Sequence, residues 1–239
     1  MTTTETARRR PIRTSILAVV AILAALVAPT LAAEHAAGAD DHAAQADGHS
    51  GHGSPTRDLT ARQLILHDQM RKLWEDHVTW TRLAIVSFAD GSAGFDATAG
   101  RLLQNQADIG DAIKPYFGDA AGTQLTALLH DHITIAVELL QAAKSGDTAA
   151  VADASTRWYA NANDIADFLA AANPRFWPQS AMRAAMKEHL DQTLAEAQHE
   201  LTGDYAASVQ DYETIHAHIL QMADTLSDGI LRAFPQLVR

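Results

Sequence analysis

Apolar residues recur every three or four positions along most of the chain after residue 58, a spacing typical of amphipathic helices. Clusters of Gly, Asn, Asp and Pro interrupt this pattern at regular intervals and indicate turns. The pattern predicts six helices, spanning residues 59–89, 95–117, 123–145, 148–172, 178–202 and 205–234. Because the connections are short, we expect consecutive helices to pack antiparallel, in an all-α six-helix up-and-down bundle.

A polar residue interrupts the apolar stripe near the middle of each predicted helix, and the stripes of the last two helices are more polar than the others. These six residues are His77, Gln106, His132, Asn161, His189 and His218. They form three consecutive pairs, one pair for every two helices. The two residues of a pair are separated from the corresponding residues of the next pair by the same number of positions. The spacing predicts three helical hairpin repeats whose polar residues lie at a similar height in the bundle.

This polar layer is a candidate metal centre. The chain has no cysteine, so a metal ion would bind through His, Asp, Glu or Met, and several imidazoles suit copper, zinc or iron. The candidate ligands in the bundle are His77, His132, His189 and His218, with Glu196 and Asp211 completing the shell. The alternative is a hydrogen-bonded layer that fixes helix register, because duplication copies a structural histidine as readily as a ligand.

Other side chains carry weaker signals. Two Glu-x-x-His words, at Glu196 and Glu213, are typical of di-iron bundles, but only one turn separates them and they lack the further glutamates such a site needs. Methionines at helical spacing usually pack in a core and less often bind copper; they are Met70, Met182, Met186 and Met222. We expect Arg82 and Arg101 to be solvated charges.

The N-terminal segment 1–32 has the pattern of an export signal peptide. Four arginines precede an apolar run over positions 16–27, and small side chains lead to a cleavage point after Ala32 or Ala33. The run is short for a membrane-spanning helix and is followed by Pro29. We therefore expect a secreted, periplasmic or cell-envelope-associated protein with no integral membrane span in its mature form.

Residues 33–58 form a His- and Asp-rich segment without a core pattern, and we expect a flexible linker before a bundle domain over 59–239. Its four histidines are His35, His42, His49 and His52. Such a composition can capture a borderline divalent ion such as copper or zinc, although it is equally typical of a solvated linker.

Charge and motifs narrow the class of function. With 18 basic and 29 acidic residues, the net charge of -11 repels nucleic acid. The chain lacks a Gly-x-Ser-x-Gly elbow, a phosphate-binding glycine loop and a His-Glu-x-x-His zinc motif. The sequence thus predicts an exported protein that captures or stores a transition metal. The alternatives are a cell-envelope structural or interaction protein with a protein partner and, third, a metal-dependent enzyme.

Three short segments of the sequence resemble a family of bacterial helical-bundle proteins. They are LWEDHVTWTR at residues 73–82, RWYANA at 157–162 and HILQMAD at 218–224. The resemblance covers about residues 60–233. It implies a helical fold and brings no activity or catalytic residue with it.

Overall fold

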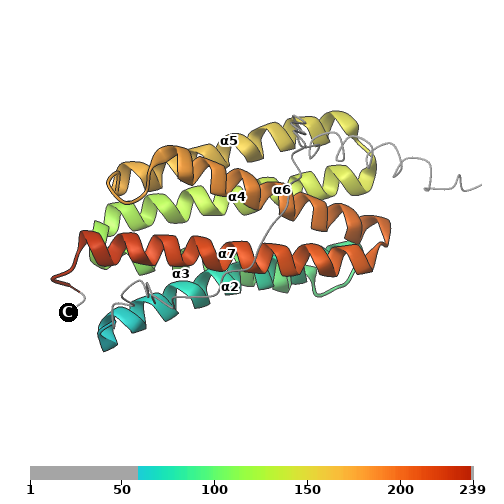
Figure 1. The fold of residues 1–239 in the computed structure, drawn as a ribbon. Coiled ribbons are helices and arrows are strands. Elements are labelled where there is room, and N and C mark those ends of the chain that lie inside the picture. The colour runs from blue at the N-terminus through green and yellow to red at the C-terminus, as the bar shows by residue number, and fades with distance from the viewer. Residues whose placement is uncertain (1–58, 238–239) are drawn as a thin grey trace, which may run out of the picture.

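The computed structural model describes residues 59–237 and shows an all-α bundle over that range (Figure 1). The helices are α2 (Ala61–Ala89), α3 (Phe95–Phe117), α4 (Asp119–Ser145), α5 (Thr148–Ala172), α6 (Gln179–Thr202) and α7 (Tyr205–Ala233). They confirm the expected six-helix up-and-down arrangement. The expected signal peptide and linker, residues 1–32 and 33–58, lie outside the described residues. Within 59–237, no helix is both long and apolar enough to cross a membrane.

The helices close into a ring. Each one packs against its neighbours in the chain, and α7 packs against α2. The first helix is anchored at its start by a capping box, in which Thr60 and Gln63 exchange side-chain to backbone hydrogen bonds. Closure places one face of every helix toward a shared interior, where each helix buries its apolar residues.

Five predicted helices agree with the structure to within two residues at each end, but α4 begins four residues earlier than expected. The predicted turn over residues 118–122 shrinks to Gly118 alone, whose positive φ of 87° breaks the helix in one step. Gly122 is consequently helical and buried. It lies against Gly110 of α3, so that the backbones of α3 and α4 approach closely.

A methyl group at this close approach should be destabilising. In Gly110→Ala, the new β-carbon would lie 2.6 Å from the Gly122 carbonyl oxygen and closer still to the Thr126 hydroxyl. Since backbone must move, we expect the free energy of unfolding to fall by about 1–3 kcal/mol. The matched control is Gly100→Ala in the same helix, which meets nothing within 4 Å and should be neutral or stabilising by up to about 1 kcal/mol. Urea unfolding of both variants tests the prediction, and equal stabilities would contradict it.

Hydrogen bonds repeat from one hairpin to the next. In each hairpin, the carbonyl four residues before the central histidine accepts a hydrogen bond from a side chain of the second helix. The three bonds are Asn105 Nδ2 to Leu73 O, Asn161 Nδ2 to Leu128 O and His218 Nε2 to Ala185 O, each 3.0 Å long. The three-hairpin repeat expected from residue spacing is therefore present in the packing of the helices.

Candidate functional site

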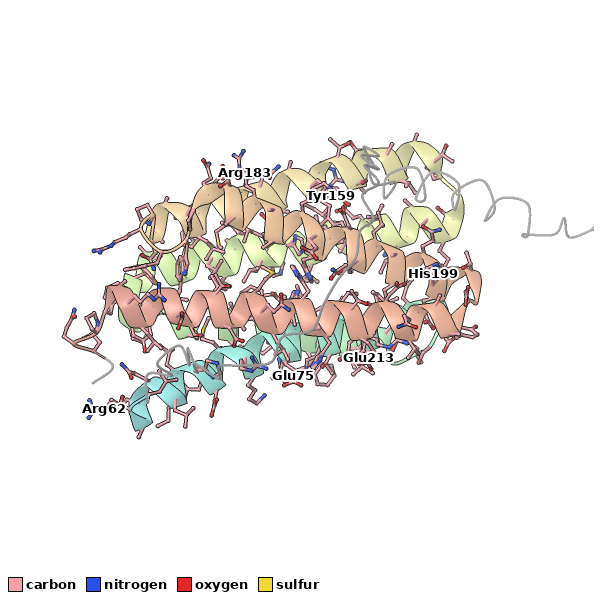
Figure 2. The ribbon with its side chains drawn as sticks, viewed as in Figure 1. Arg62, Glu75, Tyr159, Arg183, His199 and Glu213 are labelled. Atoms are coloured by element: carbon pink, nitrogen blue, oxygen red, sulfur yellow. The ribbon has the colours of Figure 1, made fainter. Side chains whose placement is uncertain are left out.

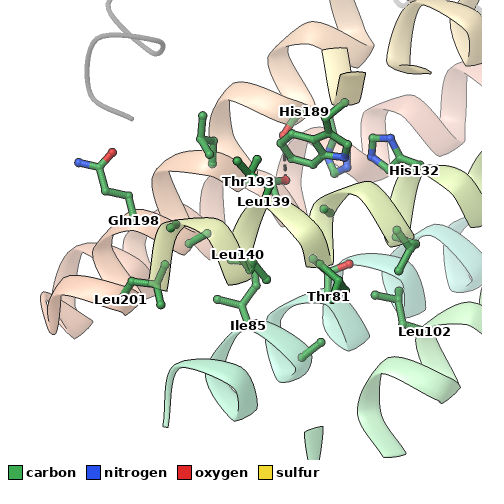
Figure 3. Close-up of a pocket in the computed structure, with 18 of the residues that line it drawn as sticks. Thr81, Ile85, Leu102, His132, Leu139, Leu140, His189, Thr193, Gln198 and Leu201 are labelled. Atoms are coloured by element: carbon green, nitrogen blue, oxygen red, sulfur yellow. Dashed lines mark hydrogen bonds between the residues drawn. The ribbon is translucent and has the colours of Figure 1, made fainter. Parts of the chain in front are cut away.

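Three histidines from alternate helices line one cavity at the centre of the bundle. His77 lies on α2, His132 on α4 and His189 on α6, and their exposed fractions are 3%, 3% and 4%. Figure 3 shows His132 and His189 at this cavity, together with aliphatic side chains such as Leu139. The cavity volume is about 60 Å³. Such a space has room for an ion or a few water molecules.

The orientation of His132 is fixed from α5. Its Nδ1 lies 2.9 Å from Asn161 Oδ1, and the amide nitrogen of Asn161 donates to the Leu128 carbonyl. Because this second bond sets which end of the amide faces the ring, Asn161 presents an acceptor to His132. His132 therefore carries its proton on Nδ1 and has a lone pair on Nε2. The Trp158 ring stacks against it at 5.2 Å between centroids.

His77 has the equivalent partner on α3. Gln106 Nε2 lies 3.2 Å from His77 Nδ1 and also donates to the Leu102 carbonyl at 2.8 Å. In this arrangement Nδ1 of His77 is the acceptor, so Nε2 carries the proton. The other end of the amide, Gln106 Oε1, is buried without a hydrogen-bond partner.

His189 is the one member of the three without a side-chain hydrogen bond. Its Nδ1 is buried and unpartnered. Its ring centroid lies 5.7 Å from that of His77 and 6.5 Å from that of His218, which is nearly parallel to it at 13°. A buried imidazole nitrogen without a partner is destabilising by about 1–3 kcal/mol, so its retention needs a reason.

The Nε2 atoms of the three cavity-lining histidines are without partners in the part of the chain that the structure describes. Among the described residues none of these atoms has a hydrogen-bond partner, and none is sealed by surrounding protein atoms. All three residues line the cavity, which thus combines apolar walls with three imidazoles from three repeats.

Burial keeps these imidazoles neutral. Desolvation lowers the pKa of His77 to about 3, with a further decrease from nearby His132, and it lowers the pKa of His132 to about 4. Desolvation also holds the pKa of His189 well below its usual value, with added repulsion from the other histidines. Neutral imidazole is the form that binds metal ions, and it is the form present at neutral pH.

Unsatisfied polar atoms gather around this layer. In residues 59–237, the buried side-chain atoms without a hydrogen-bond partner are Trp74 Nε1, Gln106 Oε1, Trp158 Nε1, His189 Nδ1 and Gln192 Oε1. The first four belong to central polar residues or to rings packed on the central histidines. Because buried polar groups in proteins are nearly always paired, such a concentration points to water or a ligand at this height.

The three histidines are not arranged as ligands around a single metal position. In the described part of the chain, no group of three or more His, Asp or Glu side chains is arranged to hold a metal ion. The imidazoles surround the cavity without all converging on one point. Loading an ion onto them therefore requires their rings to turn inward, into the space that the cavity provides.

The other predicted ligands in the bundle lie elsewhere. His218 faces a groove between α6 and α7 and does not line the central cavity. Asp211 accepts a hydrogen bond of 2.6 Å from His199 Nδ1, near the α6–α7 turn (Figure 2). His35, His42, His49 and His52 lie outside the described residues.

Glu196 belongs to a buried ionic cluster on α2, α6 and α7. Its carboxylate accepts a 2.6 Å hydrogen bond from Arg82, which also donates to the Ser208 hydroxyl, while Ser208 donates to Glu200. Burial raises the pKa of Glu196 to about 7, although Arg82 opposes the rise. The expectation that Arg82 is a solvated charge is wrong, because its side chain is only 20% exposed and neutralises two buried carboxylates.

Several residues that position the cavity lie outside the predicted ligand set. Asn105 holds the Leu73 carbonyl, and Trp74 and Trp158 pack their rings on His77 and His132. The available signal was spacing, since Trp74 and Trp158 each lie three residues before a central polar residue, on the same helix face.

Comparison with known proteins adds no relative to this description. No protein-family model matches the chain, and no curated protein or solved structure matches it significantly.

Proposed function

We propose that the protein binds a transition metal ion in the central cavity, through the imidazoles of His77, His132 and His189, and acts in metal capture or storage outside the cytoplasm. One observation carries the proposal. Three buried, neutral histidines, one from each hairpin, line a shared cavity of about 60 Å³, and within residues 59–237 their Nε2 atoms have no hydrogen-bond partner. Copper, zinc and iron all accept such ligands.

The surrounding hydrogen bonds support a ligand role. Asn161 already fixes His132 in the tautomer whose Nε2 can bind a metal. His77 differs, because Gln106 Nε2 also donates to Leu102 O and Asn105 Oδ1, and the proton of His77 is on Nε2. For His77 to bind an ion through Nε2, the Gln106 amide would have to give up these bonds and turn its unpartnered oxygen to His77 Nδ1. Each outer partner lies on the second helix of its own histidine's hairpin.

The cavity chemistry favours an ion of low charge. Its lining contains three imidazoles but no carboxylate, so a divalent ion would be buried without a compensating negative charge. The cost of burying an ion in a medium of low dielectric constant rises steeply with its charge. Among the candidate metals, copper(I) therefore suits this cavity better than zinc(II) or iron(II).

Export and the histidine-rich segment complete the proposal. The signal-like residues 1–32 would deliver the protein outside the cytoplasm. There, the four histidines of residues 33–58 would collect metal ions, as the composition of this segment predicts. The bundle would then hold an ion more tightly.

Elemental analysis of the full-length protein tests the cavity site. In a background with His35, His42, His49 and His52 changed to Asn, we expect the bundle to retain metal after dialysis against copper or zinc. His132→Gln should then lower the retained metal by a large fraction, because one cavity ligand is lost. The matched control is His130→Gln on the same helix, since His130 is exposed.

Each outcome decides between the candidate roles. Equal retention by the His132→Gln and His130→Gln proteins would overturn the cavity site. Loss of all metal on changing the histidines of residues 33–58 would assign binding to that segment. Absence of metal in every protein, with the helical circular dichroism spectrum intact, would favour the alternative of a structural polar layer in a cell-envelope interaction protein.

A further inference from the structure

His218 is turned away from the central cavity, and this orientation leaves one of its nitrogen atoms ready to bind a ligand. Its Nε2 donates to the Ala185 carbonyl at 3.0 Å, and a carbonyl oxygen can only accept. Nε2 therefore carries a proton, and in the neutral form of the ring Nδ1 carries a lone pair. Nδ1 lies 3.8 Å from Glu188 Oε1, beyond hydrogen-bond distance.

The groove that His218 lines is also lined by two methionines. A cavity of about 220 Å³ between α6 and α7 contacts His218 together with Met182 and Met222. A more open hollow beside it shares Glu188, His218 and Gln221 and leads toward solvent. Met182 and Met222 are 5% and 6% exposed, and both line this groove.

Thioether sulfur and neutral imidazole together form a ligand set selective for copper(I). Thioethers are soft ligands, which zinc and other harder divalent ions bind poorly, whereas imidazole suits copper in general. The carboxylate of Glu188 at the groove adds a negative charge that attracts a cation. We propose that the α6–α7 groove is a copper(I) site formed by Met182, Met222 and His218 Nδ1.

The two other methionines of the bundle provide an internal comparison. Met70 and Met186 are buried to a similar degree, at 2% and 3% exposure, but neither lines the groove. Helical spacing alone cannot separate the two pairs, because all four side chains fall on apolar stripes. The groove separates them, since it joins one pair to a histidine.

The groove site is independent of the cavity site proposed above, although the two are neighbours. The His218 ring lies 6.5 Å from that of His189, and His189 lines the central cavity. An ion at His218 would thus be separated from the cavity by a single imidazole. This position suits a site of entry to the bundle.

Copper(I) titration of the full-length protein tests the proposal. The measurements use the background with Asn at positions 35, 42, 49 and 52, an oxygen-free buffer and a chromophoric copper(I) chelator as competitor. We expect the Met182→Leu/Met222→Leu protein to lose one equivalent of copper(I) that the parent retains. The control protein, Met70→Leu/Met186→Leu, should keep it. Leucine matches the size of methionine and preserves packing, and thermal unfolding checks that both variants are folded.

X-ray absorption at the copper edge identifies the ligands directly. Because the chain contains no cysteine, a sulfur atom bound to copper must come from methionine. We expect sulfur scattering in the parent, the control and His132→Gln, and its loss in the groove variant. Sulfur scattering that persists in the groove variant, or is absent from the parent, would overturn the groove site. Persistence in His132→Gln with reduced total copper would show that the cavity is a separate site.

Discussion

Replacing Arg82 by methionine should lower the free energy of unfolding by about 3–5 kcal/mol at pH 8. The substitution keeps an unbranched apolar side chain but removes the counter-charge of Glu196 and Glu200, which are 1% and 5% exposed. Arg82 limits the rise in the pKa of Glu196 to about 7, so at pH 8 the variant must either bury this carboxylate without its counter-charge or protonate it, and both are unfavourable. At pH 5.5 the same carboxyl is mainly protonated, so the loss should be smaller.

Chemical denaturation at both pH values measures this effect. Adding Glu196→Gln to Arg82→Met should restore part of the stability at pH 8, because one uncompensated charge disappears. The matched control is Arg157→Met, whose partners Glu138 and Asp153 are exposed; it should change stability by less than about 1 kcal/mol. An Arg82→Met loss as small as that of the control would contradict the buried cluster.

Acidification of the metal-free protein should destabilise it between about pH 6 and pH 4.5. In the unfolded chain the histidines gain protons below pH 6.5, whereas in the bundle the pKa of His77 is about 3 and that of His132 about 4. The unfolded state then binds more protons than the folded state, so stability decreases as the pH falls. Each histidine contributes up to about 1.4 kcal/mol per pH unit.

Glu196 acts in the opposite direction over this range. Its pKa is raised from 4.5 to about 7 in the bundle, so the folded state binds its proton first and gains stability as the pH falls from 7 to 4.5. The effect of three histidines exceeds that of one carboxyl, so the free energy of unfolding still decreases as the pH falls. The decrease is on the order of 3 kcal/mol per pH unit.

A histidine variant isolates the central layer from the other titrating groups. We expect the slope of unfolding free energy against pH to be smaller in His132→Gln than in His130→Gln, by up to about 1.4 kcal/mol per pH unit. Urea unfolding at several pH values, in the presence of a metal chelator, provides the slopes. Identical slopes would mean that His132 binds its proton equally well in the folded and unfolded states, which would contradict its burial as a neutral imidazole.

The fold was predictable because the same spacing of apolar residues recurs in all six helices. This spacing predicted the ends of five helices to within two residues, and the equal offsets between successive polar pairs identified the hairpin repeat. The exception at α4 depended on Gly118, since a single residue of positive φ replaced an expected turn of several residues. A sequence shows that glycine permits such a turn but does not show how few residues the turn will use.

The candidate site was predictable only in part. Repetition placed His77, His132 and His189 at one height, but it could not reveal that His218, the fourth of the set, hydrogen-bonds to the Ala185 carbonyl and faces outward. Ring orientation depends on which neighbouring acceptor is closest, and that depends on packing between helices. Arg82 was misjudged for a similar reason, because its carboxylate partners lie on α6, far away in the chain.

The contact between α7 and α2 has a consequence for how the repeats can vary. In a linear array of helical hairpins, the outermost units expose an apolar face and need special polar caps, and further units can be appended. Here each hairpin is flanked by two others, so none of the three is terminal within residues 59–237. Adding or removing a hairpin would break the contact between α7 and α2 that closes the ring, so this architecture requires a fixed number of hairpins.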